Sequence, residues 1–406
     1  MSVTLQEFYE NHFPVSHTFK WIKAASDQSR KKRTPDHREW SVRFVNDKKI
    51  SPIRYISFSS EYAFKYFLTS RTPVRIDLGA IYVSSMLEHS EKRRQASLLN
   101  RNKKNQTEGS MPPCPDPEYK ELTFDVDMDD YDKGEGVRNC CNCICRKCWP
   151  LLSIAALLLQ HVLVDKWGFK HLLVVFSGRR GIHIWVKDRI PALFLKPIRT
   201  RLCKDYVEEY YKTIHDQNRP LLESLWLSSI KPFLCTLQDY GQSAKPSQKK
   251  LFDRVGHVQD VKDLDDQAWS LLLSFIKPRI DEGVTLTMGH TLKVPFSPHP
   301  DTGKISIPLD WKTLDKVDPD KDIPTLQTLL QDDVLTTYRE AMKRFRAWVD
   351  SDIPLSVPLP VARLEDKLAL PVIEPPVHDG ELLGRVLGHD LVQEAATHLD
   401  AGVGGG

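Results

Sequence analysis

The amino-acid sequence predicts a mixed α/β (α+β) core with mixed sheets, into which a small cysteine-rich motif and a helical subdomain are inserted. Short segments rich in β-branched and aromatic residues recur between residues 39 and 186, where turn residues separate them. Apolar residues at helical spacing dominate from 191 to 274, and strand signals return beyond 284. We therefore expect two separated parts of the chain to form the core.

Each element follows from its local pattern. Helices are expected at 5–13, 151–166, 203–214 and 268–276, and a further helix is expected to bury the face that carries Val334, Tyr338, Met342, Phe345 and Val349. The expected strands are 39–44, 53–58, 74–82, 119–127, 172–176, 182–186, 284–288 and 305–309. Residues 90–118 are rich in Lys, Arg and Pro, which favours an exposed loop.

The composition is that of a globular protein. The 406 residues include 57 Lys and Arg against 54 Asp and Glu, a net charge of +3. That balance excludes a histone-like polycation, but it is compatible with a concentrated basic cleft. The longest apolar stretch, 151–164, is shorter than the roughly 20 residues that a membrane span needs, and the first residues do not resemble a secretory signal. We expect no contact with a membrane.

Asp125 and Asp127 form the strongest local clue to chemistry. Residues two apart on a strand point to the same face, so these carboxylates converge and repel unless a cation lies between them. Mg²⁺ prefers such oxygen ligands. A calcium loop is excluded because Asp130 stands where an EF-hand needs Gly, and Gly136 stands where it needs Glu.

A basic turn, Ser177–Gly181, follows between two apolar runs and predicts a hairpin. Its glycines allow close backbone approach, and Arg179 and Arg180 offer bidentate recognition of phosphate, with His183 just beyond. In isolation such a turn is more often a solvated tip. The sequence has no P-loop motif, which disfavours an ATPase of that class.

Five of the eight cysteines crowd into one segment: Cys140, Cys141, Cys143, Cys145 and Cys148. This spacing favours a structural zinc site in an intracellular protein over a disulfide framework, and a redox Cys-x-x-Cys is the lesser alternative. Because a structural zinc ion takes four ligands and the segment has five cysteines, the role of Cys143 stays open. Farther along, Asp281, His290, Lys293 and His299 have the chemistry to complete a nucleotide site, although each alone is more often a surface charge or a satisfied histidine.

Ten segments carry a family resemblance when they are taken together: 37–41, 53–55, 75–82, 121–132, 145–149, 168–171, 177–183, 278–281, 290–299 and 303–310. In this order they closely resemble the catalytic small subunit of eukaryotic and archaeal-type DNA primases, in its eukaryotic form. The resemblance extends over about residues 5–350. It implies a primase-type catalytic core.

The resemblance also implies roles for individual residues. Asp125, Asp127 and Asp281 match three metal-binding aspartates, which would hold two Mg²⁺ or Mn²⁺ ions, and Glu39 matches an active-site glutamate. Asp77 matches a residue near the ribose, and Arg54 is expected in the same cleft. The positions that match contacts to the triphosphate are Ser177, Arg179, Arg180, His183, His290, Lys293 and His299.

For the zinc site the resemblance favours Cys140, Cys141, Cys145 and Cys148. The sequence departs from the family pattern at two points. Three residues separate Cys141 from Cys145, fewer than the family leads us to expect, and Val294 stands where a serine is usual.

The expected function is therefore template-directed synthesis of short RNA primers from ribonucleoside triphosphates on single-stranded DNA. The expected partners are a primase large subunit and, through it, the DNA polymerase alpha complex in the nucleus. A repair-type primase-polymerase or another two-metal nucleic-acid enzyme is the alternative. A non-catalytic zinc-bearing nucleic-acid-binding subunit fits less well, because the chain combines an acidic pair with a phosphate-binding hairpin.

The domain boundaries follow from the same pattern. Residues 1–188 form the first part of the catalytic core with the zinc motif at 140–148, residues 189–275 form the helical subdomain, and residues 276–352 form the second part of the core. The prolines beyond 352 predict a loosely ordered tail at 353–406.

Overall fold

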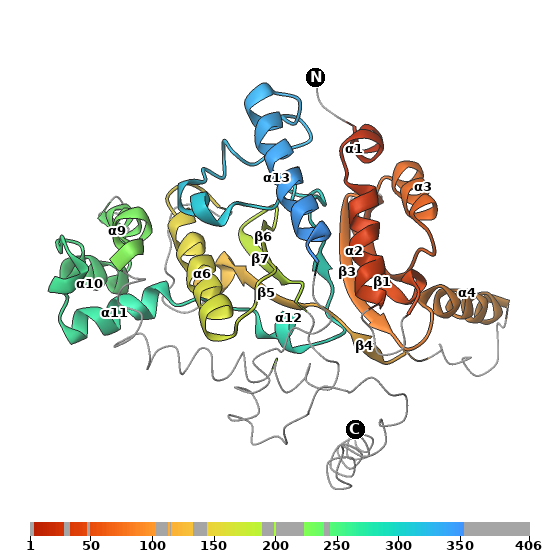
Figure 1. Cartoon of the computed structure of the whole chain (residues 1–406), viewed down its shortest axis with the longest axis horizontal. Helices are drawn as coiled ribbons and strands as arrows, with labels where there is room; N and C mark the ends of the chain where they lie inside the picture. The colour runs from red at the N-terminus through yellow and green to blue at the C-terminus, as the bar shows by residue number, and fades with distance from the viewer. Residues whose placement is uncertain are drawn as a thin grey trace, which may run out of the picture. The chain divides into compact units, whose positions relative to one another are not determined.

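The computed structural model describes residues 4–27, 33–46, 49–102, 113, 115–132, 144–188, 199, 223–238 and 244–352, all within one compact unit, Met1–Val357. Two sheets form its core (Figure 1). The expected combination of helices and sheets is confirmed. The expected mixed sheets are not, because all pairings between the described strands are antiparallel. None of the described helices is long and apolar enough to cross a membrane.

The larger sheet has the order β2-β1-β3-β4, and a short strand from far along the chain, β8, also pairs with β3. Its strands are β1 (Arg38–Asn46), β2 (Lys49–Ile56), β3 (Arg75–Tyr82), β4 (Pro117–Tyr119) and β8 (Leu292–Lys293). β3 is buried along almost its whole length. Because β8 pairs with it, residues from both parts of the core meet on this strand.

The smaller sheet has the order β5-β7-β6. It consists of β5 (Leu122–Asp127), β6 (Leu172–Phe176) and β7 (Gly181–Val186), and the expected hairpin between β6 and β7 is confirmed. Helix α6 (Trp149–His161) contacts β7, and it continues into one π-helical turn, η2 (Val162–Lys166). The apolar run that predicted a buried helix here is indeed almost entirely buried.

Four helices associate around the N-terminal part of the core: α1 (Leu5–Asn11), α2 (Val15–Asp27), α3 (Glu61–Arg71) and α13 (Asp332–Asp350). Thr4 and Glu7 form a capping box that starts α1. Trp21 of α2 packs edge-on against Trp185 of β7 at 5.1 Å and against Trp348 of α13 at 5.2 Å between ring centroids. This cluster fixes both helices to the smaller sheet, and the predicted apolar face of α13 is buried as expected.

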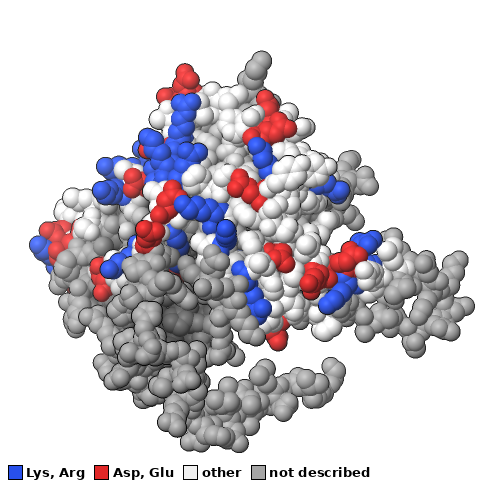
Figure 2. All heavy atoms as spheres, turned by 45° about the vertical axis from the view of Figure 1, so that its right-hand side comes forward, with Lys and Arg blue, Asp and Glu red and all other residues white. Residues whose placement is uncertain are grey.

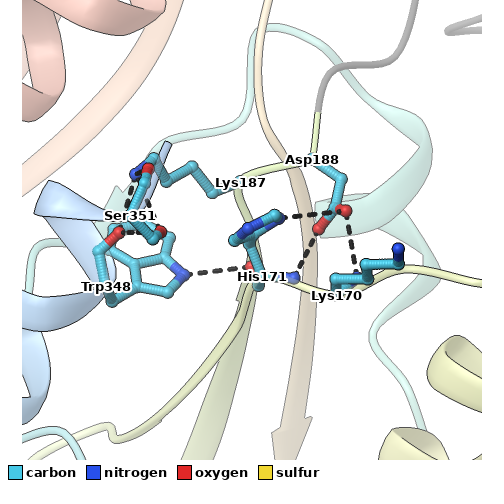
Figure 3. A network of polar contacts seen from close by, with 6 residues as sticks. All are labelled: Lys170, His171, Lys187, Asp188, Trp348 and Ser351. Atoms are coloured by element: carbon cyan, nitrogen blue, oxygen red, sulfur yellow. Dashed lines mark hydrogen bonds and ion pairs between the residues drawn. The ribbon is translucent and has the colours of Figure 1, made fainter. Parts of the chain in front are cut away.

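A polar network holds the end of α13 (Figure 3). The Lys187 ammonium donates to the carbonyl oxygens of Trp348 (2.7 Å), Val349 (2.8 Å) and Ser351 (2.7 Å), the exposed acceptors of the last helical turn. The Trp348 indole N–H donates to the His171 carbonyl oxygen at 3.0 Å. A cation at this end also complements the helix dipole, so Lys187 stabilises the position where α13 ends.

The described residues from 223 to 276 are largely helical, in keeping with the expected helical segment. The elements are η4 (Trp226–Ile230), α9 (Lys231–Gln238), α10 (Pro246–Val255), η6 (Val261–Asp263) and α11 (Asp266–Ile276). The helix expected at 203–214 and the tail expected at 353–406 lie outside the described residues. The remaining short helices are η1 (Pro35–His37), α5 (Met128–Asp132) and η7 (Trp311–Lys316).

The structure corrects the loop expected at 90–118. Most of its first half belongs to α4 (Met86–Asn102), in which the Ser85 hydroxyl accepts a hydrogen bond from the Glu88 N–H. The charged residues that suggested a loop, Glu, Lys and Arg, are good helix formers, and Arg94 pairs with Glu91 on the exposed surface. The high density of charged residues in this segment therefore indicates a helix rather than a loop.

Two strands expected near the C-terminal part of the core also differ. Residues 284–288 were expected to be extended because of their β-branched side chains, but α12 (Glu282–Leu286) forms because the Asp281 carboxylate accepts hydrogen bonds from the N–H groups of Gly283 and Val284. Residues 305–309 run beside β6, but they pair with it through one isolated bridge, Val175 with Pro308, rather than a continuous ladder. Pro308 has no N–H for such a ladder.

The segment 292–309 joins the two sheets. It begins as β8 on the larger sheet, where the Ser297 hydroxyl accepts a hydrogen bond from the Ile76 N–H at 2.8 Å. It ends beside β6, where the Ile307 carbonyl oxygen accepts from the Phe176 N–H at 3.0 Å. Side chains carried by this segment are consequently positioned between the sheets.

Candidate active site

Three carboxylates gather at the end of β5. Asp125 and Asp127 alternate with Val126 on this strand and therefore share a face. The Asp281 N–H donates to the Asp125 carbonyl oxygen at 2.9 Å, which places the third aspartate beside the pair. Burial, together with the negative charges of Asp127 and Asp281, raises the pKa of Asp125 to about 8. Carboxylates that repel one another in this way require a positive partner.

Basic side chains already approach these carboxylates. The Arg180 guanidinium lies 2.9 Å from Asp127 Oδ1 and also pairs with Asp129, while His183 Nε2 lies 3.7 Å from Asp125 Oδ1. Within the described ranges, no group of three or more His, Cys, Asp or Glu side chains already converges as a metal site. The donor set nevertheless suits Mg²⁺ or Mn²⁺, because it consists of carboxylate oxygens whose mutual repulsion a divalent cation would relieve.

The hairpin between β6 and β7 brings the basic turn to the same place. Gly178 has φ +91°, a conformation that favours glycine, and a Cβ there would lie 3.0 Å from His299 Cβ. The Ser177 hydroxyl accepts a hydrogen bond from the Gly181 N–H at 3.0 Å, which closes the turn. Arg179 faces Asp301 at 3.3 Å. The turn thus packs tightly on the segment that joins the two sheets.

Lys293 links the acidic and basic groups. It is 2 % exposed, and its ammonium donates to the Ser177 carbonyl oxygen at 2.6 Å. Burial, then the positive charge of Arg75, lowers the pKa of Lys293 to about 7, against the opposing effects of Asp77 and Asp125. Lys293 therefore lies within electrostatic reach of Asp125 on β5 while it contacts the hairpin.

The neighbouring histidines share this positive environment. Burial and the charge of Lys293 lower the pKa of His299 to about 3, and they lower the pKa of His183 well below its ordinary value. Basic groups that depress one another's pKa in this way form a site suited to a multiply charged anion. Figure 2 shows a dense group of Lys and Arg on one part of this face, with Asp and Glu both beside it and farther away.

Glu39 forms the other side of the site, where it is fully buried. Its carboxylate accepts two hydrogen bonds from Arg54, at 2.8 and 3.1 Å, and one from the Tyr82 hydroxyl at 2.8 Å. A Cβ on Gly79 would lie 2.6 Å from Glu39 Oε2, so the strand needs glycine there for a close approach. Glu39 is therefore held by Arg54 and Tyr82 and positions the Arg54 guanidinium.

Arg54 also donates to the Gly289 carbonyl oxygen at 2.7 Å, which ties this side of the site to the loop that carries His290. Burial, followed by the positive charge of Lys120, lowers the pKa of His290. Asp77 is 1 % exposed, and its carboxylate pairs with Arg75 at 2.7 Å. The charges of Arg54 and Asp77 both act on His290, so the structure brings these three residues into one region.

The cysteine motif is described only in its second half. Cys140, Cys141 and Cys143 lie outside the described residues. The Sγ atoms of Cys145 and Cys148 lie 3.7 Å apart. Two thiolates on one tetrahedral zinc ion, each about 2.3 Å from it, would be about 3.8 Å apart, so this pair has the spacing of two zinc ligands.

Local sequence patterns do not identify four residues of the site: Arg75, Tyr82, Lys120 and Arg43, whose charge acts on Lys293 and His299. Arg75 precedes Asp77 by two residues on a strand, and that spacing already predicts a shared face. The other three carried no usable signal, because their places depend on strand pairing and on contacts between distant segments.

Comparison with known proteins finds a shared similarity to one group of enzyme subunits. Residues 124–311 match the family described as DNA primase small subunit. The DNA primase small subunit of Schizosaccharomyces pombe is 28% identical over 82% of this chain and 78% of the relative, and that of Saccharomyces cerevisiae is 28% identical over 86% and 91%. The Drosophila melanogaster protein of the same description is 28% identical over 83% of this chain and 84% of its own length.

Proposed function

We propose that this chain, which is similar to the DNA primase small subunits of three eukaryotes, belongs to that family and is the catalytic subunit of a eukaryotic-type DNA primase. As such it is a nucleotidyltransferase that joins ribonucleoside triphosphates into short RNA primers on single-stranded DNA. The observation that carries the proposal is the place of Lys293, which contacts the basic hairpin and lies within electrostatic reach of Asp125 on β5. Nucleotidyl transfer needs both groups on one phosphate chain.

The carboxylates supply the acidic half of this chemistry. Asp125, Asp127 and Asp281 would hold two divalent cations, Mg²⁺ or Mn²⁺. Cations held there would lower the pKa of the primer 3′-hydroxyl and stabilise the leaving pyrophosphate. The cap that the Asp281 carboxylate forms on α12 fixes its backbone beside β5, and the alternation along β5 aims the other two carboxylates at the same point.

The basic half would orient the triphosphate. Arg179 and Arg180 present guanidinium groups suited to bidentate phosphate binding, and Lys293 adds an ammonium fixed by the Ser177 carbonyl oxygen. His183 and His299 have lowered pKa values, so each is a neutral imidazole that offers one N–H donor. These groups act by positioning and by stabilising charge, which supply most of the catalysis in phosphoryl transfer.

The ribose of the nucleotide would be recognised on the opposite side of the site. Asp77 offers a buried carboxylate that can accept a hydrogen bond from a ribose 2′-hydroxyl, the group that distinguishes RNA precursors from DNA precursors. Arg54 and His290 lie in the same region, and Glu39 holds Arg54 in place.

The similarity to DNA primase small subunits supports a complex with a large subunit and with DNA. The finer proposal is that the large subunit connects this chain to the DNA polymerase alpha complex in the nucleus. Cys140, Cys141, Cys145 and Cys148 would hold a structural zinc ion, in support of which the sulfurs of Cys145 and Cys148 have a suitable separation.

A primer-synthesis assay on unprimed single-stranded DNA tests the proposal. We expect RNA products that require added ribonucleoside triphosphates and a divalent cation, with release of pyrophosphate. The double variant Asp125→Ala, Asp127→Ala should abolish synthesis. Shortening of the template without incorporation would instead identify a nuclease, and undiminished synthesis by the double variant would overturn the assignment.

A further inference from the structure

A β-bulge interrupts the pairing of β1 with β2 beside the candidate active site. Two residues of β2, Arg54 and Tyr55, stand opposite the single residue Ser41 where the register shifts. Tyr55 has φ +62°, a left-handed conformation that is unfavourable for an aromatic residue and persists only where surrounding contacts hold it. Neighbouring residues of a regular strand point to opposite faces, whereas the Arg54 guanidinium lies over the Tyr55 ring, 5.0 Å from its centroid. The bulge therefore brings these two side chains together.

The Tyr55 ring connects Arg54 to helix α4. The Arg93 guanidinium of α4 lies over the same ring, 5.1 Å from its centroid, and the His89 ring meets it edge-on at 5.7 Å between centroids. The Tyr55 ring also packs against a buried cluster formed by β3 and the first residue of α4. These contacts fix α4 against the part of the sheet that carries Arg54.

The two arginines that share this ring differ in their other partners. Arg54 donates to the Glu39 carboxylate and to the Gly289 carbonyl oxygen. Arg93 is partly buried, and it makes no hydrogen bond or ion pair with the residues that the structure describes. A cation–π contact uses the charge of a guanidinium but none of its N–H donors. Arg93 is therefore held in place with donors available to an anion.

Lys92 adds a second cation beside Arg93. The two residues follow His89 by three and four positions along α4, so both flank the face that His89 turns to Tyr55. Burial, followed by the charges of Arg93 and Lys92, lowers the pKa of His89, and the negative charge of Glu39 opposes this effect. Lys92 is exposed, and it too lacks a hydrogen bond or ion pair within the described part of the chain. The side of α4 next to the site thus presents two cations to solvent.

The strand order indicates which anion these cations would meet. Lys293, assigned above to the triphosphate, lies on β8 beside β3, whereas α4 contacts β2. β1 separates β2 from β3, and two strand spacings amount to about 10 Å. The α4 cations are therefore on the side of Arg54, away from the triphosphate. A template that pairs with the incoming nucleotide must pass next to it, and every nucleotide of that strand carries a phosphate.

We propose that α4 is a nucleic-acid contact of this protein, in which Arg93 and Lys92 bind phosphates of the single-stranded DNA template beside the incoming nucleotide. The proposal rests on the proposed function, because templated synthesis places a DNA strand at this edge of the site. Arg93, held over Tyr55, supplies N–H donors in a fixed position, and Lys92 adds a mobile charge. Because Arg54 and Arg93 share one ring, the same bulge positions a nucleotide contact and a template contact.

Binding of a fluorescent deoxythymidine oligonucleotide to the full chain, followed by anisotropy at several salt concentrations, tests this contact. Each phosphate of a single strand that a cation neutralises contributes about 0.7 to the steepness of log affinity against log salt. Arg93→Met should lower the steepness by about 0.7 and weaken binding about fivefold at about 0.1 M salt, and adding Lys92→Met should lower the steepness by about 1.4 in total. Arg93→Lys keeps the charge and should retain the steepness, a rescue that a merely structural role would not show.

Arg94→Met is the matched control, because Arg94 is the next residue of α4 and is already paired with Glu91 at 2.7 Å. It should leave the salt dependence unchanged, and Arg93→Met should leave the affinity for ATP with Mg²⁺, measured by calorimetry, unchanged. Unaltered steepness in Arg93→Met, an equal change in Arg94→Met, or a loss of ATP affinity instead of DNA affinity would overturn the inference. If Arg93→Met lowers the thermal midpoint, the comparison rests on the exposed Lys92, for which unaltered steepness in Lys92→Met has the same consequence.

The inference and the proposed function can fail separately. A chain that makes primers while Arg93→Met retains the full salt dependence of DNA binding would refute only the α4 contact. A chain that incorporates no ribonucleotide, although Arg93→Met lowers the steepness, would refute the proposed function and the role of the bound strand as a template, and it would support a DNA contact on α4.

Discussion

Asp77 of β3 and Lys293 of β8 are register partners, although they are 216 positions apart in the sequence. The pairing places a buried ammonium and a buried carboxylate side by side on the larger sheet, and it directs the Lys293 ammonium to the hairpin of the smaller sheet at 2.6 Å. The two sheets therefore meet at the group that we propose to bind phosphate.

Replacing Lys293 by Met should lower both stability and activity. The substitution removes an ammonium that donates to the Ser177 carbonyl oxygen and lies beside the buried Asp77 carboxylate, so the thermal midpoint without nucleotide should fall. Synthesis should fall by roughly 100-fold or more in kcat/KM, because a preorganised cation is lost. Calorimetric scanning should also show that added ATP no longer raises the midpoint; retained stabilisation by ATP would count against the assigned role.

Gly79→Ala should disturb Glu39. Its new Cβ would lie 2.6 Å from Glu39 Oε2, whose carboxylate is fixed by Arg54 and Tyr82. We expect a loss of about 1–3 kcal/mol in the free energy of unfolding, measured by urea denaturation, and a weakened nucleotide affinity. Gly289→Ala is the matched control, since its Cβ would meet no described atom within 4 Å. Equal effects of the two substitutions would contradict this account.

The stability of the protein should depend on the protonation of Lys120. Burial, followed by the charge of Arg199, lowers its pKa to about 7 in the folded chain, against about 10.4 in an unfolded chain. Between these values the unfolded chain holds the extra proton, so this lysine makes stability rise as the pH rises from about 7 to about 10, and it adds no slope below that window.

Lys120→Met removes that contribution. In urea titrations between pH 7.5 and 9.5, the dependence of the free energy of unfolding on pH should fall by roughly one proton relative to the unmodified chain. Lys316→Met, at the end of η7, should leave the dependence unchanged. An identical slope in Lys120→Met would show that Lys120 keeps its charge in the folded state.

Zinc content tests the cysteine motif. Elemental analysis of the purified chain should find about one zinc ion per molecule, and Cys145→Ser should remove it because the tetrahedral set needs four ligands. Cys235→Ser is the control, since that free cysteine is exposed and lies on α9. Full zinc content in Cys145→Ser would exclude Cys145 as a ligand.

Local sequence patterns predicted the structural features that depend only on residues close together in the chain. Alternation along β5 was enough to pair Asp125 with Asp127, and the basic turn between two apolar runs was enough to predict the hairpin. The helical face of α13 followed from spacing alone. In each case one strand, one helix or one turn sets the geometry, so the local sequence is sufficient to predict it.

Such local patterns could not predict contacts between segments that are distant in the sequence. Asp281 reaches β5 through a backbone hydrogen bond to Asp125, and its neighbours became a helix because its own carboxylate caps them. The family resemblance identified this aspartate, whereas composition and periodicity did not. Arg43 was missed for a similar reason, because its relation to Arg75 and Lys293 exists only after three strands have paired.

The rate of the first phosphodiester bond, measured by pyrophosphate release on unprimed single-stranded DNA with saturating ribonucleoside triphosphates, tests the central claim most directly. Asp125→Asn keeps the size of the side chain and removes one negative charge, and it should lower the rate by at least about 1,000-fold if this carboxylate holds a catalytic cation. Asp333→Asn, in the first turn of α13, should leave the rate unchanged. A rate for Asp125→Asn within a few-fold of the unmodified chain would contradict the proposal that bond formation takes place at the β5 carboxylates.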